Sequence, residues 1–234
     1  MIDFHSHVLP GMDDGSSSVE ESVRLLTALG EQGADTVAAT SHFYATRQTP
    51  ARFLERRAAA AEQLRPMLND RLPRILLGAE VLYFPGVSRM EELSKLCLQG
   101  TNLILLEMPF ETWTNGMFRE VQELARSGRF TVLLAHIERY YDLQPVSVWD
   151  SLLEAGVLMQ ANADFFLRFR SRRKALKLLQ EGRIHLLGTD CHNMQSRPPR
   201  MGEAVEFIRK RLGSDTLDEM EALGRDLLAE TIHK

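Results

Sequence analysis

Short apolar runs alternate with longer amphipathic stretches along most of the chain, and this alternation restricts the fold more than any other feature. The apolar runs are Ile2–Phe4, Thr36–Thr40, Ile75–Ala79, Leu103–Leu106, Thr131–Ala135, Val157–Ala161 and Ile184–Gly188. The helical patterns are Val19–Gln32, Pro50–Leu68, Arg89–Leu98, Phe118–Ser127, Val148–Glu154, Arg172–Gln180, Arg200–Leu212 and Leu217–Glu230. Buried strands separated by helices predict a parallel sheet with right-handed crossovers.

Seven strands in 234 residues favour closure into a (β/α)7-type barrel, with an open doubly wound sheet as the alternative. The chain length and the absence of a long linker predict a single domain over residues 1–234. In either architecture we expect the functional site at the C-terminal ends of the strands.

Charge and composition restrict the class of protein. The net charge of −4 and the pI of about 6.0 predict no nucleic-acid partner, because no overall positive field would attract one. The apolar stretches are too short to span a bilayer, and the N-terminus does not resemble a secretory signal. The two cysteines cannot form a disulfide framework, so we expect a cytoplasmic protein with no membrane insertion.

Ionisable side chains follow six of the seven apolar runs. In chain order these candidates are His5, His7, one of the adjacent pair Asp13 and Asp14, His42, Glu80, Glu107, His136, Asp190 and His192. Burying one unpaired charge costs several kcal/mol, and carboxylates gathered at one end of a sheet would repel one another. Divalent cations among these side chains would remove that cost, so the pattern predicts a metal centre. His185 and His233 stand apart from the strand ends, and we interpret them as structural or incidental.

The donor types also indicate which metals to expect. Imidazoles and carboxylates without a thiolate cluster suit Mn²⁺, Fe²⁺ or Zn²⁺, and nine candidate ligands exceed what one ion can use. Centres with two or three ions activate water for an in-line displacement at phosphorus. Arg139 and Arg197 follow the fifth and seventh runs, where guanidinium groups would match phosphate oxygens.

Several motifs resemble the PHP (polymerase and histidinol phosphatase) superfamily, in particular its bacterial manganese-dependent protein-tyrosine phosphatases from capsule and exopolysaccharide operons. The matching stretches are IDFHSHVLPGMDDG, TSHF, GAEVLY, AHIERY and TDCHN…RPPRM, in this order between Met1 and Met201. The resemblance implies a distorted (β/α)7 barrel that holds three Mn²⁺ ions, with Fe²⁺ or Zn²⁺ as alternatives.

The resemblance also implies a role for each site residue. One ion takes His5, His7, Glu80 and Asp190; a second shares Glu80 and adds Glu107 and His136; a third takes Asp14, His42 and His192. Arg139 and Arg197 would contact the phosphate, and together with His136 and Asp190 they form the expected catalytic set.

The implied function is hydrolysis of protein phosphotyrosine by a metal-activated hydroxide. The implied partner is a tyrosine autokinase that regulates capsular or exopolysaccharide synthesis. A histidinol-phosphate phosphatase, or another enzyme for small phosphomonoesters on the same scaffold, is the alternative. Cys191, between two expected ligands, and Arg200, after the Pro-Pro pair, depart from the family pattern, and neither departure removes an expected ligand.

Four other functions fit the sequence less well. Cys191 and Arg197 have the C-x5-R spacing of thiol-dependent tyrosine phosphatases, but the loop between them lacks glycine. An amidohydrolase barrel would present a lysine at a strand end, and none is found there. A nuclease or proofreading module does not fit the net acidity, and a non-catalytic binding protein would not need the full ligand set.

Two further groups of residues could serve substrate binding. Ten aromatic residues follow the strand ends and would either stack on a phenyl group or cap the barrel core: Phe43, Tyr44, Tyr83, Phe84, Phe110, Trp113, Tyr140, Tyr141, Phe165 and Phe166. The basic stretch Arg168–Lys174 is interpreted as a solvated helix face, with steering of an acidic phosphopeptide as the alternative.

Overall fold

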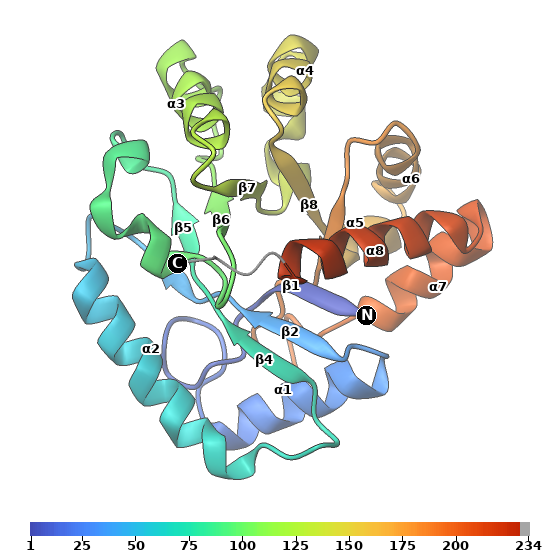
Figure 1. The fold of residues 1–234 in the computed structure, drawn as a ribbon. Helices are drawn as coiled ribbons and strands as arrows, with labels where there is room; N and C mark the ends of the chain where they lie inside the picture. Colours follow the sequence, from blue (N-terminus) through green and yellow to red (C-terminus); the bar gives the residue numbers. More distant parts are fainter. Residues whose placement is uncertain (230–234) are drawn as a thin grey trace.

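The computed structural model describes residues 1–229, and its strands all run parallel. The strands are β1 (Ile2–Ser6), β2 (Thr36–Ala39), β3 (His42–Phe43), β4 (Arg74–Leu77), β5 (Glu80–Leu82), β6 (Leu103–Glu107), β7 (Thr131–Leu134), β8 (Leu158–Asn162) and β9 (Leu186–Gly188). They form a three-stranded sheet in the order β1-β2-β4 and a curled six-stranded sheet in the order β3-β5-β6-β7-β8-β9. All seven predicted strands are therefore present (Figure 1).

The second and third predicted strands are each followed, after a break of two residues, by a further short strand that was not predicted. β2 stops at Ala39 and β3 resumes at His42, while β4 stops at Leu77 and β5 resumes at Glu80. Across this break β3 pairs with β5, so that His42 lies opposite Glu80. The break thus places two candidate ligands side by side at the start of new strands.

The ring of strands closes where β1 runs beside the end of β9. Ser6 forms a parallel bridge with Cys191, and the amide of Asp190 donates to the His5 carbonyl at 2.7 Å. Gly188 makes this approach possible, because a Cβ at that position would lie 2.5 Å from the His5 Cβ. The fold is therefore a distorted (β/α)7 barrel, as predicted, and not an open sheet.

Helices surround the barrel on the outside (Figure 1). They are α1 (Val19–Glu31), α2 (Pro50–Leu64), α3 (Asn115–Arg126), α4 (Val146–Glu154), α5 (Ala163–Leu167), α6 (Arg172–Gln180), α7 (Met201–Leu212) and α8 (Asp215–Ala229). Side chains of Ser18, Thr49 and Thr114 cap the first three helices by accepting backbone N–H groups, which explains where these helices begin.

One helix prediction was wrong, and one short helix was missed. The stretch Arg89–Leu98 is not an α-helix but contains the 3₁₀ turns η2 (Val87–Arg89) and η3 (Glu91–Leu96). The short helix α5 between β8 and α6 was not predicted. Its five residues span little more than one turn, which is too short for a helical period to appear.

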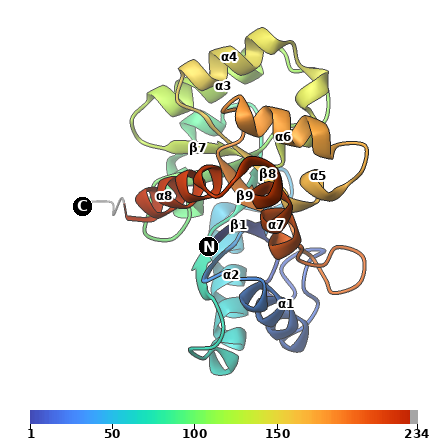
Figure 2. The same ribbon diagram turned by 90° about the vertical axis from the view of Figure 1, so that its right-hand side faces the viewer.

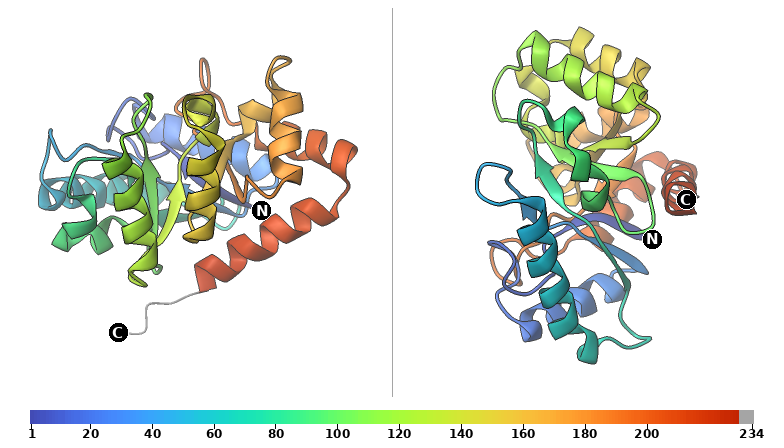
Figure 3. Two further views of the ribbon diagram at one scale, coloured as in Figure 1. Left: turned by 90° about the horizontal axis from the view of Figure 1, so that it is seen from above. Right: turned by 60° about the vertical axis from the view of Figure 1, so that its left-hand side comes forward.

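The apolar core has two parts. A large cluster joins the sheet to the surrounding helices, whereas a smaller cluster fills the inside of the barrel. The inner cluster contains Ile2, Phe4, Leu76, Leu103, Leu105, Leu133 and Leu186, and Leu227 of α8 joins it. Gly224 of α8 lies directly on the Phe4 ring. Helix α8 thus closes the N-terminal end of the barrel, where it lies along one side of the molecule (Figures 2 and 3).

Two remaining expectations concern membrane-spanning segments and the two histidines that stand apart from the strand ends. Among residues 1–229, no helix combines the length and the apolar character that a bilayer span requires. His185 is partly buried and its Nδ1 accepts the amide of Met159, in agreement with a structural role, while His233 lies outside the described residues.

Candidate metal centre

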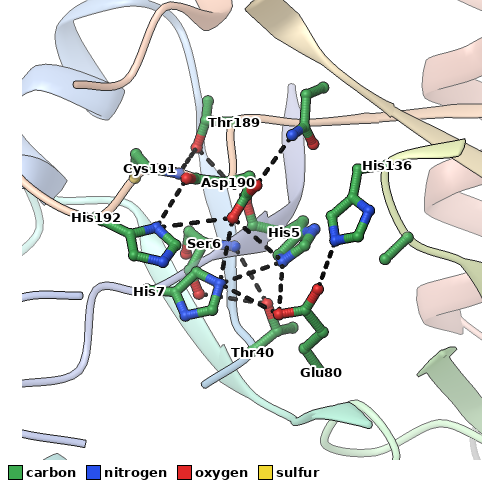
Figure 4. Close-up of polar contacts among 12 residues, drawn as sticks. His5, Ser6, His7, Thr40, Glu80, His136, Thr189, Asp190, Cys191 and His192 are labelled. Atoms are coloured by element: carbon green, nitrogen blue, oxygen red, sulfur yellow. Dashed lines mark hydrogen bonds and ion pairs between the residues drawn. The ribbon is translucent and has the colours of Figure 1, made fainter. Parts of the chain in front are cut away.

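All nine predicted ligands meet at the C-terminal end of the barrel. His5 and His7 come from β1 and the residue after it, His42 from β3, Glu80 from β5, Glu107 from β6, and the others from the loops after β1, β7 and β9. Figure 4 shows the side chains of His5, His7, Glu80, His136, Asp190 and His192 pointing toward one another. Most of these side chains are buried, whereas Asp14 is 69% exposed.

Four ligand atoms surround one point in the middle of this cluster. The Nε2 atoms of His5 and His7 are 3.2 Å apart. They lie 3.4 and 3.5 Å from Glu80 Oε2 and 3.6 and 3.3 Å from Asp190 Oδ1. These are the four residues that the family resemblance groups around one ion.

The other two expected ligand groups lie on either side. On one side, His136 Nε2 lies 2.8 Å from Glu80 Oε1 and 3.4 Å from Glu107 Oε1. On the other side, Asp14 Oδ1 lies 3.3 Å from His42 Nε2 and 3.5 Å from His192 Nε2. Glu80 touches both the central group and the His136 group, as a bridging ligand would.

Two observations show that the cluster fits divalent cations. Ligand atoms that share an ion about 2.1 Å away lie roughly 3.0 to 3.4 Å apart, close to the separations found here. In addition, six buried side-chain polar atoms among residues 1–229 lack a hydrogen bond, and three of them, His42 Nδ1, Glu80 Oε2 and His192 Nε2, lie within 3.5 Å of another candidate ligand. His42 Nδ1 and Glu80 Oε2 are only 2.7 Å apart, yet neither makes a hydrogen bond.

The electrostatics of the cluster also favour added positive charge. Burial opposes protonation of His136, but Glu107 and Glu80 outweigh it and raise the His136 pKa to about 9. For Glu80, burial disfavours the charged form, yet the surrounding imidazoles hold its pKa well below the usual range. The buried carboxylates are therefore stabilised by positive charge close to them. Protonated imidazoles supply this charge when no metal ion is bound.

A second set of residues orients the candidate ligands from behind. Asp13 accepts from His7 Nδ1 at 2.8 Å and also accepts the amide of His42, so His7 keeps its Nε2 directed toward the centre. Asp13 therefore supports a ligand, while its neighbour Asp14 faces the centre. Strand periodicity does not tell these adjacent aspartates apart, and it was the family resemblance that indicated Asp14.

The end of β8 supplies two orienting residues that sequence reasoning missed. Gln160 Oε1 lies 3.2 Å from His5 Nδ1 and 2.7 Å from the His136 amide, both possible donors to this oxygen. Gln160 Nε2 donates to Asn162 Oδ1, and Asn162 Nδ2 donates to Asp190 Oδ2 at 3.0 Å. This chain of amides links three candidate ligands, His5 on β1 and His136 and Asp190 in the loops after β7 and β9. Neutral amides carry no charge that would have marked them in the sequence.

Backbone conformation separates two of the candidate ligands from the rest of the chain. His136 and Asp190, with φ of 32° and 53°, are the only non-glycine residues with positive φ among residues 1–229. A side chain raises the energy of this conformation, so surrounding structure must hold it in place. Such strain is concentrated at functional sites, and both side chains point into the cluster (Figure 4).

The two predicted phosphate-binding arginines meet at the outer oxygen of Asp190. Arg139 Nη2 and Arg197 Nη2 lie 2.5 and 2.6 Å from Asp190 Oδ2, whereas Oδ1 of the same carboxylate faces the histidines. The side chains of Arg139 and Arg197 are 34% and 37% exposed. Two guanidinium groups are therefore present at the mouth of the centre.

The thiol-dependent alternative is contradicted by the position of Cys191. Its side chain is fully buried, and burial raises the pKa of the thiol to about 12. A nucleophilic cysteine needs an accessible thiolate, so the C-x5-R spacing is accidental.

Most of the ten aromatic residues are core residues and not a substrate wall. Phe43, Tyr140 and Phe166 are fully buried, and Trp113 and Phe165 are nearly so. Phe110 differs, because it is 54% exposed. Its ring meets the His136 ring edge-on, with the ring centroids 5.9 Å apart. Tyr44 stacks on His42 at 5.2 Å on the opposite side of the centre.

Comparison with known proteins identifies the family. The family model described as "Capsular polysaccharide synthesis, CpsB/CapC" matches residues 1–224. The chain belongs to the CpsB/CapC family. Curated relatives of this CpsB/CapC chain include tyrosine-protein phosphatase YwqE of Bacillus subtilis, 30% identical over 92% of this chain and 86% of the relative. Tyrosine-protein phosphatase CpsB of Streptococcus pneumoniae is 29% identical over 94% of both chains.

Solved structures agree with this assignment. A structure from a study of YwqE and CpsB, described as unique metal-dependent tyrosine phosphatases, has a TM-score of 0.85 at 26% identity and covers 99% of this chain and 95% of its own. A chain of archaeal ribonuclease P with mature tRNA matches with a TM-score of 0.58 at 14% identity, covering 96% and 89%, which shows a shared fold alone. The resemblance to metal-dependent tyrosine phosphatases inferred from the motifs is confirmed.

Proposed function

We propose that this CpsB/CapC-family chain is a metal-dependent phosphatase that hydrolyses phosphotyrosine in proteins. The observation that carries the proposal is the convergence of nine imidazole and carboxylate side chains beside two partly exposed arginines. Relatives that span almost the whole chain are named tyrosine-protein phosphatases, which supports the same activity.

The proposed ions are three Mn²⁺, held in the groups described above. The first group is His5, His7, Glu80 and Asp190; the second is Glu80, Glu107 and His136; the third is Asp14, His42 and His192. Bound divalent ions supply acidification of water and neutralisation of phosphate charge. The nine residues contribute by holding this charge in a mostly buried site, where electrostatic interactions are stronger than in water.

Arg139 and Arg197 are proposed to bind the phosphate of the substrate. Each guanidinium has five N–H donors, so contact with Asp190 leaves donors for phosphate oxygens. Asp190 then serves two purposes, because one oxygen faces the ligand cluster and the other orients both arginines. The two positive charges are most useful in the transition state, when charge accumulates on the equatorial oxygens.

The phenyl group of phosphotyrosine is proposed to lie against Phe110. This exposed ring is next to His136, and the Arg139 guanidinium lies 5.5 Å from its centroid. An offset or edge-on contact with a substrate ring would distinguish phosphotyrosine from aliphatic phosphates. A phenolate is a good leaving group because the pKa of tyrosine is about 10, so the reaction needs no strong general acid.

We further propose that the physiological substrate is a tyrosine autokinase that regulates capsular or exopolysaccharide synthesis. The capsular polysaccharide description of the family supports this context. Autophosphorylation consumes ATP, so we propose a cytoplasmic site of action. We also propose that residues 1–234 act as one domain, since a single layer of helices surrounds a single barrel in residues 1–229.

The experiment compares four substrates with purified protein: a phosphotyrosine peptide, the matching phosphoserine peptide, histidinol phosphate and single-stranded DNA. Each is incubated with Mn²⁺ and, separately, with excess chelator. We expect Mn²⁺-dependent release of phosphate from the phosphotyrosine peptide well above the others. Faster turnover of histidinol phosphate, or turnover that survives the chelator, would contradict the proposal.

A further inference from the structure

A cavity of 610 Å³ adjoins the metal centre on the side of α5 and α6. We call it the α5–α6 cavity, and its lining includes Arg139, Asn162, Arg168, Arg170 and Lys174. Arg139 and Asn162 belong to both places, because each also contacts Asp190 Oδ2. A ligand in the cavity would therefore lie directly beside a phosphate bound at the centre.

The cavity has unused positive charge. Its three carboxylates are already engaged: Asp164 pairs with Arg168 and Arg200, Asp142 pairs with Lys174, and Glu138 accepts the amide of Asn162. Arg170 is exposed and makes no side-chain hydrogen bond or ion pair with any residue from 1 to 229. The lining thus contains an arginine with all five donors available.

The start of helix α6 adds to this positive charge. Ser171 occupies the N-cap position, but its Oγ donates to the Phe165 carbonyl and does not cap the helix. The first turn then contains Arg172, Arg173 and Lys174, at the end of a helix where positive side chains are unfavourable. An anion in the cavity would offset both the helix dipole and these charges.

An aromatic side chain lies beside the cavity opening. Phe169 is 79% exposed, the most exposed of the large hydrophobic residues in the described chain, and the Arg172 guanidinium lies 4.9 Å from its ring centroid. Phe169 also belongs to the cavity lining. Apolar and cationic groups together are suited to a peptide side chain, and less so to a free inorganic ion.

We propose that the α5–α6 cavity binds an anionic side chain of the same peptide whose phosphotyrosine occupies the metal centre. This inference rests on the proposed function and adds a sequence preference to it. The anion is a carboxylate or the phosphate of a second phosphotyrosine, since both match a guanidinium in charge and geometry. The enzyme therefore selects phosphotyrosines with acidic or phosphorylated neighbours.

The test measures binding and turnover with matched peptides. Fluorescent peptides carry a non-hydrolysable phosphonate analogue of phosphotyrosine, and a glutamate, a phosphotyrosine analogue or a glutamine at each of the three positions on either side. Anisotropy titrations with the Mn²⁺-loaded protein give Kd, and the hydrolysable versions give kcat/KM. We expect the wild type to favour an anionic neighbour at one or more positions by roughly threefold to tenfold, less at high salt.

Two variants decide whether the cavity is responsible. In Arg170→Gln, and more strongly in Arg168→Gln/Arg170→Gln, the ratio of Kd for neutral over anionic peptides should fall toward one. Arg71→Gln is the control, because Arg71 is exposed, precedes β4 at the opposite end of the barrel and makes the same change of charge. Comparing glutamate with phosphotyrosine neighbours shows which anion is preferred.

The possible failures are distinguishable. A wild type that hydrolyses phosphotyrosine but shows no preference for anionic neighbours overturns the cavity proposal alone. An unchanged preference in the double variant, or an equal loss in Arg71→Gln, also overturns it. Absence of phosphotyrosine hydrolysis with Mn²⁺ overturns the proposed function and this inference with it.

Discussion

The two ends of the barrel are built from opposite kinds of side chains. At the N-terminal end, aliphatic and aromatic residues fill the interior and α8 covers them, with Gly224 against Phe4. At the C-terminal end, imidazoles and carboxylates occupy positions that are buried except at Asp14 and, in part, His42. Burial stabilises the first end directly, by about 25 cal/mol per Å² of apolar surface, whereas burial of the second end is costly without compensating charge.

This difference shows how one scaffold separates stability from function. The strands are continuous and apolar at the end that α8 closes, and they break or turn into irregular conformations at the other end. The breaks before His42 and Glu80 and the positive φ of His136 and Asp190 all lie at the C-terminal end. We therefore expect substitutions at the C-terminal end to change activity and substitutions at the N-terminal end to change stability.

The largest expected effect is the loss of turnover in His136→Ala or Asp190→Ala. Each removes a candidate ligand at a strained backbone position, so we expect kcat for a phosphotyrosine peptide to fall by at least about a thousandfold. Thermal unfolding of the metal-free variants should stay close to that of metal-free wild type. His185→Ala is the control, because this histidine lies outside the cluster and accepts the Met159 amide. Turnover near the wild-type rate in either ligand variant would contradict the assignment of function to the C-terminal end of the barrel.

A smaller effect is expected for Gln160→Leu, which keeps the volume but removes the amide that faces His5 and His136. Loss of such orienting contacts weakens metal binding by about 10- to 100-fold. Titration with Mn²⁺ of the chelator-treated protein should show this change, with activity recovered at high Mn²⁺. An unchanged Mn²⁺ affinity would show that the chain of amides is not needed to orient the ligands.

At the opposite end, Gly224→Leu should lower stability without affecting chemistry. The new side chain would collide with Phe4, since even a Cβ would lie 2.9 Å from its ring. We expect the free energy of unfolding in urea to fall by about 2 kcal/mol, with kcat/KM of the folded enzyme unchanged. Ala222→Leu, on the exposed side of the same helix, is the control and should change stability by less than about 0.5 kcal/mol. A loss of kcat/KM in Gly224→Leu would contradict the separation of the two ends.

The smallest effect is expected for Cys191→Ser, although Cys191 lies between two candidate ligands. The thiol is buried and takes no part in the proposed chemistry, so activity should stay within about threefold of the wild type. Chelation should abolish the activity of this variant and of the wild type alike. An inactive Cys191→Ser protein with full Mn²⁺ content would instead support a thiol-dependent mechanism.

Sequence periodicity predicted the seven strands and most helices because each is long enough to show a pattern. It did not predict β3 and β5, since these strands of two and three residues lie beyond the apolar runs and are too short to show a period of their own. Charged residues at strand ends were found because burial of charge is unusual. Gln160 and Asn162 were missed because neutral amides are common at any position, and only the folded chain brings them to His5 and Asp190.

Metal content tests the central claim most directly. Purified protein is loaded with Mn²⁺, dialysed against metal-free buffer, and measured by elemental analysis together with Glu80→Gln, which removes the charge that contacts four histidines. The account predicts more than one and up to three ions per wild-type chain, fewer in the variant, and phosphotyrosine hydrolysis in proportion to the ions retained. A wild-type chain that binds no divalent ion, or that hydrolyses phosphotyrosine at full rate without one, would contradict it.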